Sequence, residues 1–365
     1  MRKKHFLFAS VLALLCGSST LHAQDFKLTS SGYFKNQGVD VMAFDDIYPE
    51  GHQGGVCIIM NGHRVATNGD IRLEATPGQW QPVPKQLDRK LGDNSITATL
   101  CYPDSSRHLT GFNPMIYPDL HLIYTVNVES KGKNIEVTVD LDRPIPQEFI
   151  GKVGFNLEFF PGSLFGKPWI MDGQSGIFPQ QPNSPLMTTQ PNYLHTGNYH
   201  DGKKSLADMD KLIGKGYSPI VADDIISEPY AKGTKFTSRP DDPYNKVTIE
   251  SLSGDLQLFD GRMNHNNGWF VLRSNIKPGV TKGAVKWIIT PNVVADWMYQ
   301  PVIQTSQIGY HPTQDKEAVI EMDIRDNRKE TAQIIRIDAD GEKVVKNVTP
   351  ANWGKFLLSL IHISE

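Results

Sequence analysis

Cysteine is scarce, positive charge is not in excess, and long apolar runs are absent beyond the first two dozen residues of this chain. Only three cysteines occur, which excludes a disulfide-dense scaffold and a zinc site built from four cysteines. The formal net charge is −3, and no lysine or arginine cluster marks a surface for nucleic acid or an anionic membrane. No later segment is long and apolar enough for a transmembrane helix. We therefore expect neither nucleic acid nor a membrane span.

The first 23 residues have the organisation of an export signal. A basic segment (2–4) precedes an apolar core (6–15), and a small-residue cleavage site ends at Ala23. Cys16 lies where a lipid anchor could be attached, but Leu15 occupies a position that favours a small residue. We favour cleavage after Ala23 over lipid attachment, and expect the mature protein in the periplasm or outside the cell.

Export leaves two interpretations open for the remaining cysteines. Cys57 and Cys101 form an even pair, and an oxidising compartment permits a disulfide between them. The alternative is two buried thiols that pack as small apolar side chains. Two cysteines alone do not make a metal site.

Alternation of apolar and polar residues with a period of two dominates the chain from about residue 26 to residue 300. The segments 120–128 and 135–141 predict a long antiparallel hairpin with one buried face. A second hairpin is predicted for 56–60 and 64–67, around the turn residues Asn61 and Gly62.

Four further strands complete the prediction for this region, and they cover residues 96–100, 247–252, 256–258 and 285–289. Only the short segment 205–213 has a helical pattern. The sequence thus predicts an all-β fold, with a large antiparallel β-sandwich over residues 24–300.

A smaller unit follows, with predicted strands at 302–307, 317–323, 331–337 and 343–348. Three of its motifs are a Ser-Gln-Ile-Gly-Tyr-His-Pro turn, a Lys-Glu-Ala-Val-Ile strand and an Asp-Ala-Asp-Gly-Glu-Lys hairpin, and they cover Ser306–Pro312, Lys316–Ile320 and Asp338–Lys343. This pattern resembles the N-terminal immunoglobulin-like domain of glycoside hydrolase family 9, the cellulase-type endoglucanases. The preceding sandwich is similar only in general style to sugar-associated β-sandwich domains.

The resemblance implies a helical catalytic barrel after the immunoglobulin-like domain. In that barrel one carboxylate of an Asp-Ala-Gly-Asp motif activates water and a distant glutamate protonates the leaving oxygen, which requires two carboxyl groups about 6.5–9.5 Å apart. No Asp-Ala-Gly-Asp motif occurs in this chain, so no catalytic residue can be carried over. The implied partners are a polysaccharide or oligosaccharide and a catalytic domain in cis.

The C-terminal unit is shorter than the domain that it resembles. An immunoglobulin-like sandwich has about seven strands, whereas the segment 301–357 supplies four. Leu358 to Glu365 matches the translation of a DNA adapter used in transposase-based library preparation, and an apolar strand is the alternative for these residues. We expect an incomplete immunoglobulin-like domain with unpaired strand edges, followed by an artefactual tail at 358–365.

Polar motifs in the sandwich give little evidence for catalysis. The aspartate doublets lie near prolines, where such side chains commonly cap turns, and they are Asp45-Asp46, Asp223-Asp224 and Asp241-Asp242. No His-Glu-x-x-His motif or cysteine–histidine quartet occurs, and no glycine-rich phosphate loop, so no metal or cofactor is predicted.

Two tryptophans remain as candidates for stacking on a sugar ring. Trp80 and Trp169 both lie in segments that resemble loops, and ordinary packing is the alternative for each. The sequence favours the non-catalytic N-terminal portion of an exported glycoside hydrolase that acts on a β-glucan-like polysaccharide. A glycan-binding or surface-assembly protein is the alternative, and a catalytic sandwich such as a lyase or epimerase is the third.

Overall fold

The computed structural model describes residues 25–45, 54–74, 77, 84–102, 108–109, 115–116, 120–182, 228–263, 268–326, 331–356 and 359–364. These residues contain strands and three single-turn 3-10 helices, at Gln147–Phe149, Pro161–Ser163 and Gly261–Met263, and no α-helix. Among them, no helix is long and apolar enough to cross a membrane. The predicted export signal and the predicted helix at 205–213 lie outside the described residues.

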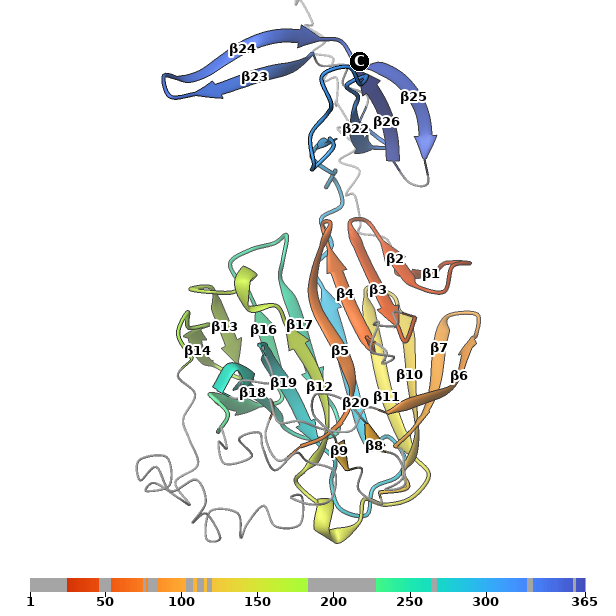
Figure 1. The fold of residues 1–365 in the computed structure, drawn as a ribbon. Helices are drawn as coiled ribbons and strands as arrows, with labels where there is room; N and C mark the ends of the chain where they lie inside the picture. The colour runs from red at the N-terminus through yellow and green to blue at the C-terminus, as the bar shows by residue number, and fades with distance from the viewer. Residues whose placement is uncertain are drawn as a thin grey trace, which may run out of the picture.

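Two nine-stranded sheets dominate the molecule (Figure 1). The first sheet consists, in spatial order, of β1 (Lys27–Leu28), β2 (Phe34–Asn36), β3 (Val39–Ala43), β4 (Val56–Met60), β5 (His63–Leu73), β12 (Val153–Phe159), β19 (Phe270–Asn275), β18 (Leu256–Asp260) and β15 (Ala231–Gly233). All neighbouring strands are antiparallel. The predicted hairpin around Asn61 and Gly62 is confirmed as β4–β5.

The second sheet is also antiparallel throughout. Its spatial order is β14 (Gln174–Ile177), β13 (Pro168–Met171), β16 (Lys235–Ser238), β17 (Val247–Ser251), β20 (Val285–Pro291), β11 (Asn134–Leu141), β10 (Ile123–Lys131), β7 (Ser95–Cys101) and β6 (Lys85–Leu91). The predicted hairpin of 120–128 with 135–141 is confirmed as β10–β11. A separate short pair joins β8 (His108–Leu109) to β9 (Met115–Ile116).

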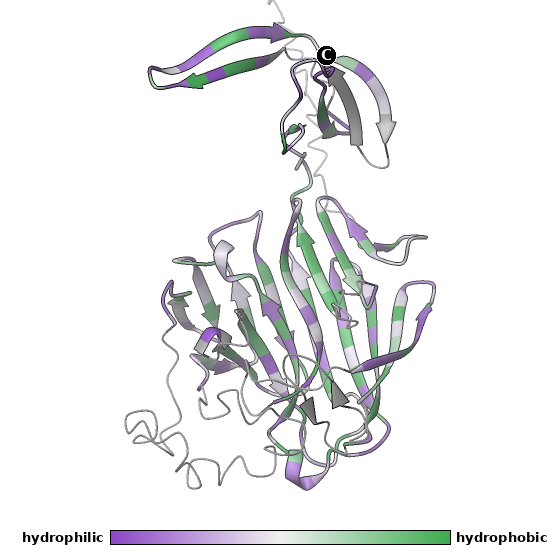
Figure 2. Cartoon of the chain, in the orientation of Figure 1, coloured by the Kyte–Doolittle hydropathy of each residue, from purple (hydrophilic) through white to green (hydrophobic). Residues whose placement is uncertain are grey.

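The two sheets pack through apolar side chains that occupy every second position of their strands. The bands of alternating hydropathy along the strands are visible in Figure 2. Trp287 of β20 meets Phe155 of β12 edge to face, with ring centroids 5.0 Å apart. Its indole N–H donates to Ser274 Oγ on β19 at 3.0 Å, so the one polar atom of the buried ring is satisfied. The predicted all-β sandwich is therefore confirmed.

The C-terminal part of the chain adds two small sheets. One has the order β21 (Val302–Gln304), β22 (Ala318–Asp323), β26 (Ser359–Ser364) and β25 (Ala351–Phe356). The other is the hairpin of β23 (Ala332–Asp338) and β24 (Gly341–Val348). Most of the segment 358–365 thus forms a strand, β26, paired with β22 and β25.

The β23–β24 hairpin has no third strand among the described residues. Its apolar side chains face outward, with Ile337 76% exposed and Ile335 and Val344 also exposed. These two side chains of opposite strands, Ile335 and Val344, are register partners on one face. Such an uncovered apolar ribbon with two unpaired edges is a site where another chain could add.

The linker between the sandwich and the C-terminal sheets is held on both sides. The carbonyl oxygen of Trp297 accepts a hydrogen bond from Gln37 Nε2 of the sandwich at 2.8 Å and another from Arg325 of the C-terminal part. Arg325 is itself fixed by a bidentate contact with Asp323, whose second oxygen also accepts the Tyr299 backbone N–H at 3.2 Å. One carbonyl therefore ties the two parts of the chain together.

Two glycines make room for the aromatic rings of this linker. A Cβ atom on Gly38 (φ +66°) would lie 2.8 Å from the ring of Trp297, and one on Gly62 (φ +82°) would lie 3.2 Å from the ring of Tyr299. The rings of Trp297 and Tyr299 contact each other edge to face, with centroids 4.5 Å apart. The linker is therefore docked on the β2–β3 and β4–β5 turns instead of spanning a gap.

Replacement of Trp287 by alanine should destabilise the sandwich by about 3–5 kcal/mol, because it leaves a large cavity between the sheets. Ile177→Ala on β14 is the control, since Ile177 is 64% exposed, and it should change the stability by less than about 0.5 kcal/mol. Urea denaturation followed by fluorescence and circular dichroism measures both. Equal midpoints for the two variants would contradict this packing.

Gly38→Ala should loosen the linker, because the new methyl group meets Trp297 and the Asn61 side chain. We expect faster limited proteolysis within residues 292–301 and a larger radius of gyration in solution scattering. Gly151→Ala is the matched control: Gly151 also has a positive φ, of +80°, but a Cβ there meets nothing within 4 Å. If both variants are cleaved at the wild-type rate, the linker is not held by this contact.

Candidate functional site

A cluster of charged and amide side chains lies on three neighbouring central strands of the first sheet. We call it the charged cluster, and it consists of Asp70 and Arg72 on β5, Glu74 just after β5, Asn156 and Glu158 on β12, and Arg273 on β19. Every member is buried. Fully buried charged side chains are rare in proteins unless they are paired, which makes this the part of the molecule with the most unusual chemistry.

The alternation of the strands places the cluster on the outer side of the first sheet. Phe155 and Ser274 contact Trp287 of the second sheet, so they face the space between the sheets. Their sequence neighbours Asn156 and Arg273, which are register partners, therefore point to the opposite side. Outer faces of antiparallel sandwiches normally face water, and the burial of this one is a distinguishing feature.

Arg273 has the contacts of a structural residue. Its Nε donates to Asn275 Oδ1 at 2.7 Å. One terminal nitrogen donates to Glu74 Oε1 at 3.2 Å and Asn156 Oδ1 at 3.0 Å, and the other to the carbonyl oxygens of Glu74 and Lys152 at 3.1 and 3.0 Å. A guanidinium has five N–H donors, and all five are used here.

Arg72 differs from Arg273 although it lies on the same face. It is 8% exposed. Its closest acidic contact is Asp70 Oδ2, which lies 3.7 Å from a terminal nitrogen, beyond hydrogen-bond distance. Among the described residues its guanidinium makes no hydrogen bond. Arg72 is thus a buried cation whose charge is balanced by neighbouring acids while its donors stay available.

Asp70 is fixed through only one of its two oxygens. Oδ1 accepts the Tyr124 hydroxyl at 2.9 Å and the Ile71 backbone N–H at 2.7 Å. Tyr124 comes from the second sheet and reaches Asp70 beyond the point where β4 ends, since the register pairs Val56 with Gly69. Burial raises the pKa of Asp70 to about 6, against the opposing effects of Arg72 and of these hydrogen bonds.

Glu74 is a second acid whose proton affinity is increased. Burial raises its pKa to about 7, although Arg273 and the Asn156 amide, which donates to Oε1 at 2.6 Å, favour the charged form. Glu158 accepts from Asn68 Nδ2 at 2.6 Å and stabilises the charge of Arg72. Near neutral pH the cluster therefore combines hydrogen-bond donors and acceptors in a buried environment, as sites that bind polar ligands do.

No group of three or more potential metal ligands occurs among the described residues. The cluster itself contributes acids and arginines without histidine or cysteine. Its chemistry suits hydrogen bonding and proton exchange, and no covalent step follows from its geometry.

Of the two tryptophans predicted to contact sugar, Trp80 lies outside the described residues. Trp169 does not lie in a loop but in strand β13, and it is 7% exposed. Its ring covers Gly176 of β14, where a Cβ atom would lie 2.5 Å away. The predicted loop at Trp169 is therefore wrong. The ring face is used for packing, as the alternative interpretation has it, and is not free to stack on a sugar.

The disulfide that export would permit between Cys57 and Cys101 is not formed in this structure. Cys57 is a buried thiol on β4 of the first sheet, and Cys101 is a thiol at the end of β7 in the second sheet. Each lies within its own strand ladder, opposite Met42 and Ile123 respectively. The alternative of buried thiols therefore holds for Cys57, whereas Cys101 is half-buried.

The aspartate doublets contribute nothing to the cluster where the structure describes them. Asp242 caps a turn: it accepts from the Tyr244 backbone at 2.8 Å, Asn245 Nδ2 at 2.9 Å and Arg239 at 2.5 Å. Partial burial acts to raise the pKa of Asp242, but these donors outweigh it and the pKa is lowered. Asp46 and the doublet at 223–224 lie outside the described residues.

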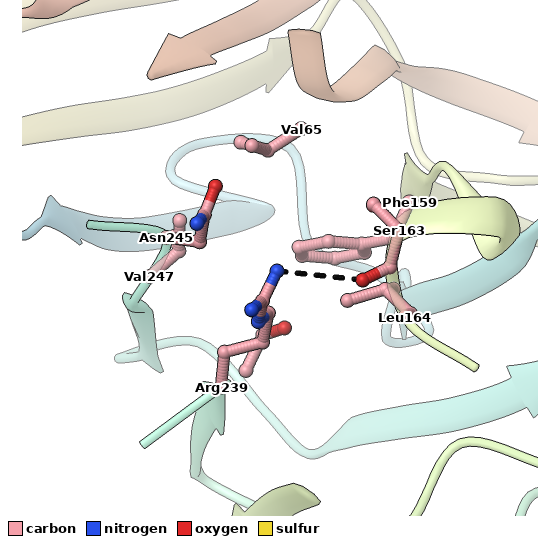
Figure 3. Close-up of a pocket in the computed structure, with 8 residues that line it drawn as sticks. Val65, Phe159, Ser163, Leu164, Arg239, Asn245 and Val247 are labelled. Atoms are coloured by element: carbon pink, nitrogen blue, oxygen red, sulfur yellow. Dashed lines mark hydrogen bonds between the residues drawn. The ribbon is translucent and has the colours of Figure 1, made fainter. Parts of the chain in front are cut away.

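A small cavity lies near this turn (Figure 3). It leaves about 10 Å³ for the centre of a water molecule, and its lining includes Phe159, Ser163 and Arg239. Arg239 Nε is buried without a hydrogen-bond partner, while a terminal nitrogen reaches the Ser163 carbonyl at 3.4 Å. The size and the single unused donor suit one water molecule, not a sugar.

Stability should fall as the pH rises from about 4 to about 7. The pKa values of Asp70 and Glu74 are raised in the folded state, so the folded state binds more protons than the unfolded state in this window. A difference of one pKa unit between the folded and unfolded states changes the free energy of unfolding by about 1.4 kcal/mol. Denaturant titrations at several pH values measure this change.

Glu74→Gln should reduce this slope, because it removes one titrating group and leaves an acceptor for Asn156 and Arg273. Glu250→Gln on β17 is the control, since Glu250 forms an exposed pair with Lys235. A slope in Glu74→Gln that equals that of the wild type would show that Glu74 titrates as it does in the unfolded chain.

Comparison with known proteins adds little to this site. No family model matches the chain, and no curated protein matches it. Among solved structures, the Slr1438 protein from Synechocystis sp. PCC 6803 aligns with 11% identity over 80% of this chain and 100% of its own, with a TM-score of 0.31. At that score the likeness carries no argument about fold or function.

Proposed function

We propose that this chain is the non-catalytic N-terminal portion of an exported glycoside hydrolase similar to family 9, which acts on a β-glucan-like polysaccharide. The catalytic barrel would follow the C-terminal sheets as a partner in cis. The observation that carries this proposal is the order of motifs in the C-terminal part. The turn Ser306–Pro312 lies between β21 and β22, and the Asp338–Lys343 motif forms the β23–β24 hairpin.

The residues of the turn have structural roles that account for the motif. Gly309 has φ +80°, which favours glycine, and its N–H bonds to the Ser306 carbonyl at 3.2 Å. The Tyr310 hydroxyl donates to the Glu317 carbonyl and accepts the Ser306 backbone N–H at 3.2 Å. Tyr310 thereby closes the loop that leads into β22, which supports the resemblance at the level of individual residues.

The docked linker gives the sandwich a mechanical role in this proposal. Gln37 and Arg325 bind the same Trp297 carbonyl, so the C-terminal sheets are held in a defined direction relative to the sandwich. A domain that follows these sheets would be presented to polysaccharide from a fixed support. This supports a buttressing function and requires no chemistry in the sandwich.

A glycan-binding protein is the second candidate function, and the contrast between the two buried arginines favours it. Arg273 uses all its donors within the protein, whereas Arg72 keeps its donors available beside acidic acceptors. Hydroxyl groups of a sugar need both kinds of partner. The packing of Trp169 removes one of the two aromatic contacts that the sequence suggested for this function.

The coding sequence downstream of Phe356 tests the first candidate. We expect it to continue through the remaining immunoglobulin-like strands into a helical domain with an Asp-Ala-Gly-Asp motif. The extended protein should hydrolyse soluble mixed-linkage β-glucan with inversion at the anomeric carbon, followed by NMR, and the chain described here should not. A stop codon soon after Phe356 would overturn the proposal.

A further inference from the structure

We propose that Arg72 and Asp70 form a binding site for a hydroxyl group of a neutral saccharide, on the outer face of the first sheet. This inference deepens the second candidate function and rests on it. It names the residues of the site, which the sequence did not indicate, and it narrows the expected saccharide to a neutral one.

The Arg72 guanidinium is buried and makes no hydrogen bond among the described residues. Burial of a polar group without a hydrogen bond costs free energy, and Arg72 is 8% exposed. Its nitrogen atoms are not among the fully buried atoms that lack a partner, so they retain contact with solvent. A ligand hydroxyl that reached these nitrogens would replace this solvent contact with a hydrogen bond.

A carboxylate oxygen lies beside the Arg72 donors. Asp70 Oδ1 is engaged by Tyr124 and Ile71, and the remaining oxygen, Oδ2, lies 3.7 Å from the Arg72 guanidinium. A water molecule can bridge two polar groups that are more than 3.5 Å apart, and a sugar hydroxyl can take the place of that water. A sugar hydroxyl accepts from Arg72 and donates to Asp70 at the same time, so both groups are satisfied by one ligand atom.

The acids around Arg72 disfavour an anionic ligand. An arginine with free donors commonly binds a carboxylate or phosphate. Here Asp70, Glu74 and Glu158 all act on the charge of Arg72, and Arg273 is the other cation of the cluster. An anionic ligand would meet three acids, whereas a neutral polyol meets none of this repulsion. The site therefore favours a neutral glycan over a uronate.

Anchoring of Asp70 gives the site a fixed geometry. Tyr124 belongs to the second sheet, and Tyr102, which follows β7 of that sheet, donates to the Ile71 carbonyl at 3.0 Å. Both hydroxyls hold β5 at the point where it has lost its β4 neighbour. A recognition pair supported in this way is preorganised, which reduces the entropy cost of binding.

Isothermal titration of residues 24–365 with cellohexaose and with soluble mixed-linkage β-glucan tests this inference. We expect binding by the wild type and a loss of about 10- to 100-fold in Arg72→Met and in Asp70→Asn, as for the removal of a charged hydrogen-bond partner. Arg143→Met is the matched control: Arg143 is an exposed arginine paired with Asp142, and the variant should bind as the wild type does.

If Arg72→Met fails to fold, Asp70→Asn still tests the site. The asparagine side chain keeps an oxygen that can accept the hydrogen bond from Tyr124, so this variant is expected to fold. In addition, the Arg72 Nε–H signal in the NMR spectrum of the wild type should shift on addition of cellohexaose. Unchanged binding in folded Asp70→Asn, or tighter binding of polygalacturonate than of the neutral glucans, would overturn the inference.

The outcome separates the two levels of the proposal. Wild-type binding that is indifferent to Arg72 and Asp70 leaves a glycan-binding protein but removes this site. Absence of wild-type binding to both glucans removes the glycan-binding function and this site together, and it leaves the proposal of a support for a catalytic domain intact.

Discussion

The guanidinium of Arg273 is the interaction on which the arrangement of the outer face depends. It joins β19 to the end of β5 through Glu74, to β12 through Asn156, and to the segment before β12 through Lys152. Removal of one partner from a buried ion pair costs several kcal/mol, because the other charge is left uncompensated. The three central strands therefore keep their register on the outer face by polar contacts, in addition to the apolar contacts between the sheets.

Period-two alternation is sufficient to predict most strands of the sandwich. The β10–β11 and β4–β5 hairpins follow directly from it, since a buried face fixes the register of a strand. The same rule does not reveal whether the polar face is covered. The run Asp70-Ile71-Arg72-Leu73-Glu74 has the pattern of a strand with a solvated face, and its burial depends on tertiary packing that local sequence does not encode.

The charged cluster could not be predicted from the sequence, and the loop predicted at Trp169 is wrong, for the same reason. In both cases the outcome depends on which tertiary contacts cover the side chain. Lys167 and Pro168 before Trp169 favour a loop, yet β13 begins at Pro168 and the ring packs over Gly176. Proline is acceptable at the first residue of a strand. The sequence signal for this site is the three charged residues at alternating positions in and just after β5, together with the charged residues of β12 and β19. These residues can be recognised as one cluster only once it is known that the three distant strands pair.

The position of the charged cluster along β5 decides what the sandwich can contribute to a polysaccharide complex. β5 starts at His63, beside the turn whose Gly62 lies under Tyr299, and its far end carries Asp70 and Arg72. At about 3.3 Å per residue, roughly 25–30 Å of strand separates the linker from the cluster. One sugar residue cannot contact both. A glycan bound at Arg72 would therefore be held apart from any cleft beyond the linker, so the sandwich would anchor the polymer at a distance and would not extend that cleft. The linker is docked at the start of β5, so the length of β5 fixes the distance between the linker and the cluster. One molecule could therefore serve both candidate functions, glycan binding and the support of a catalytic domain.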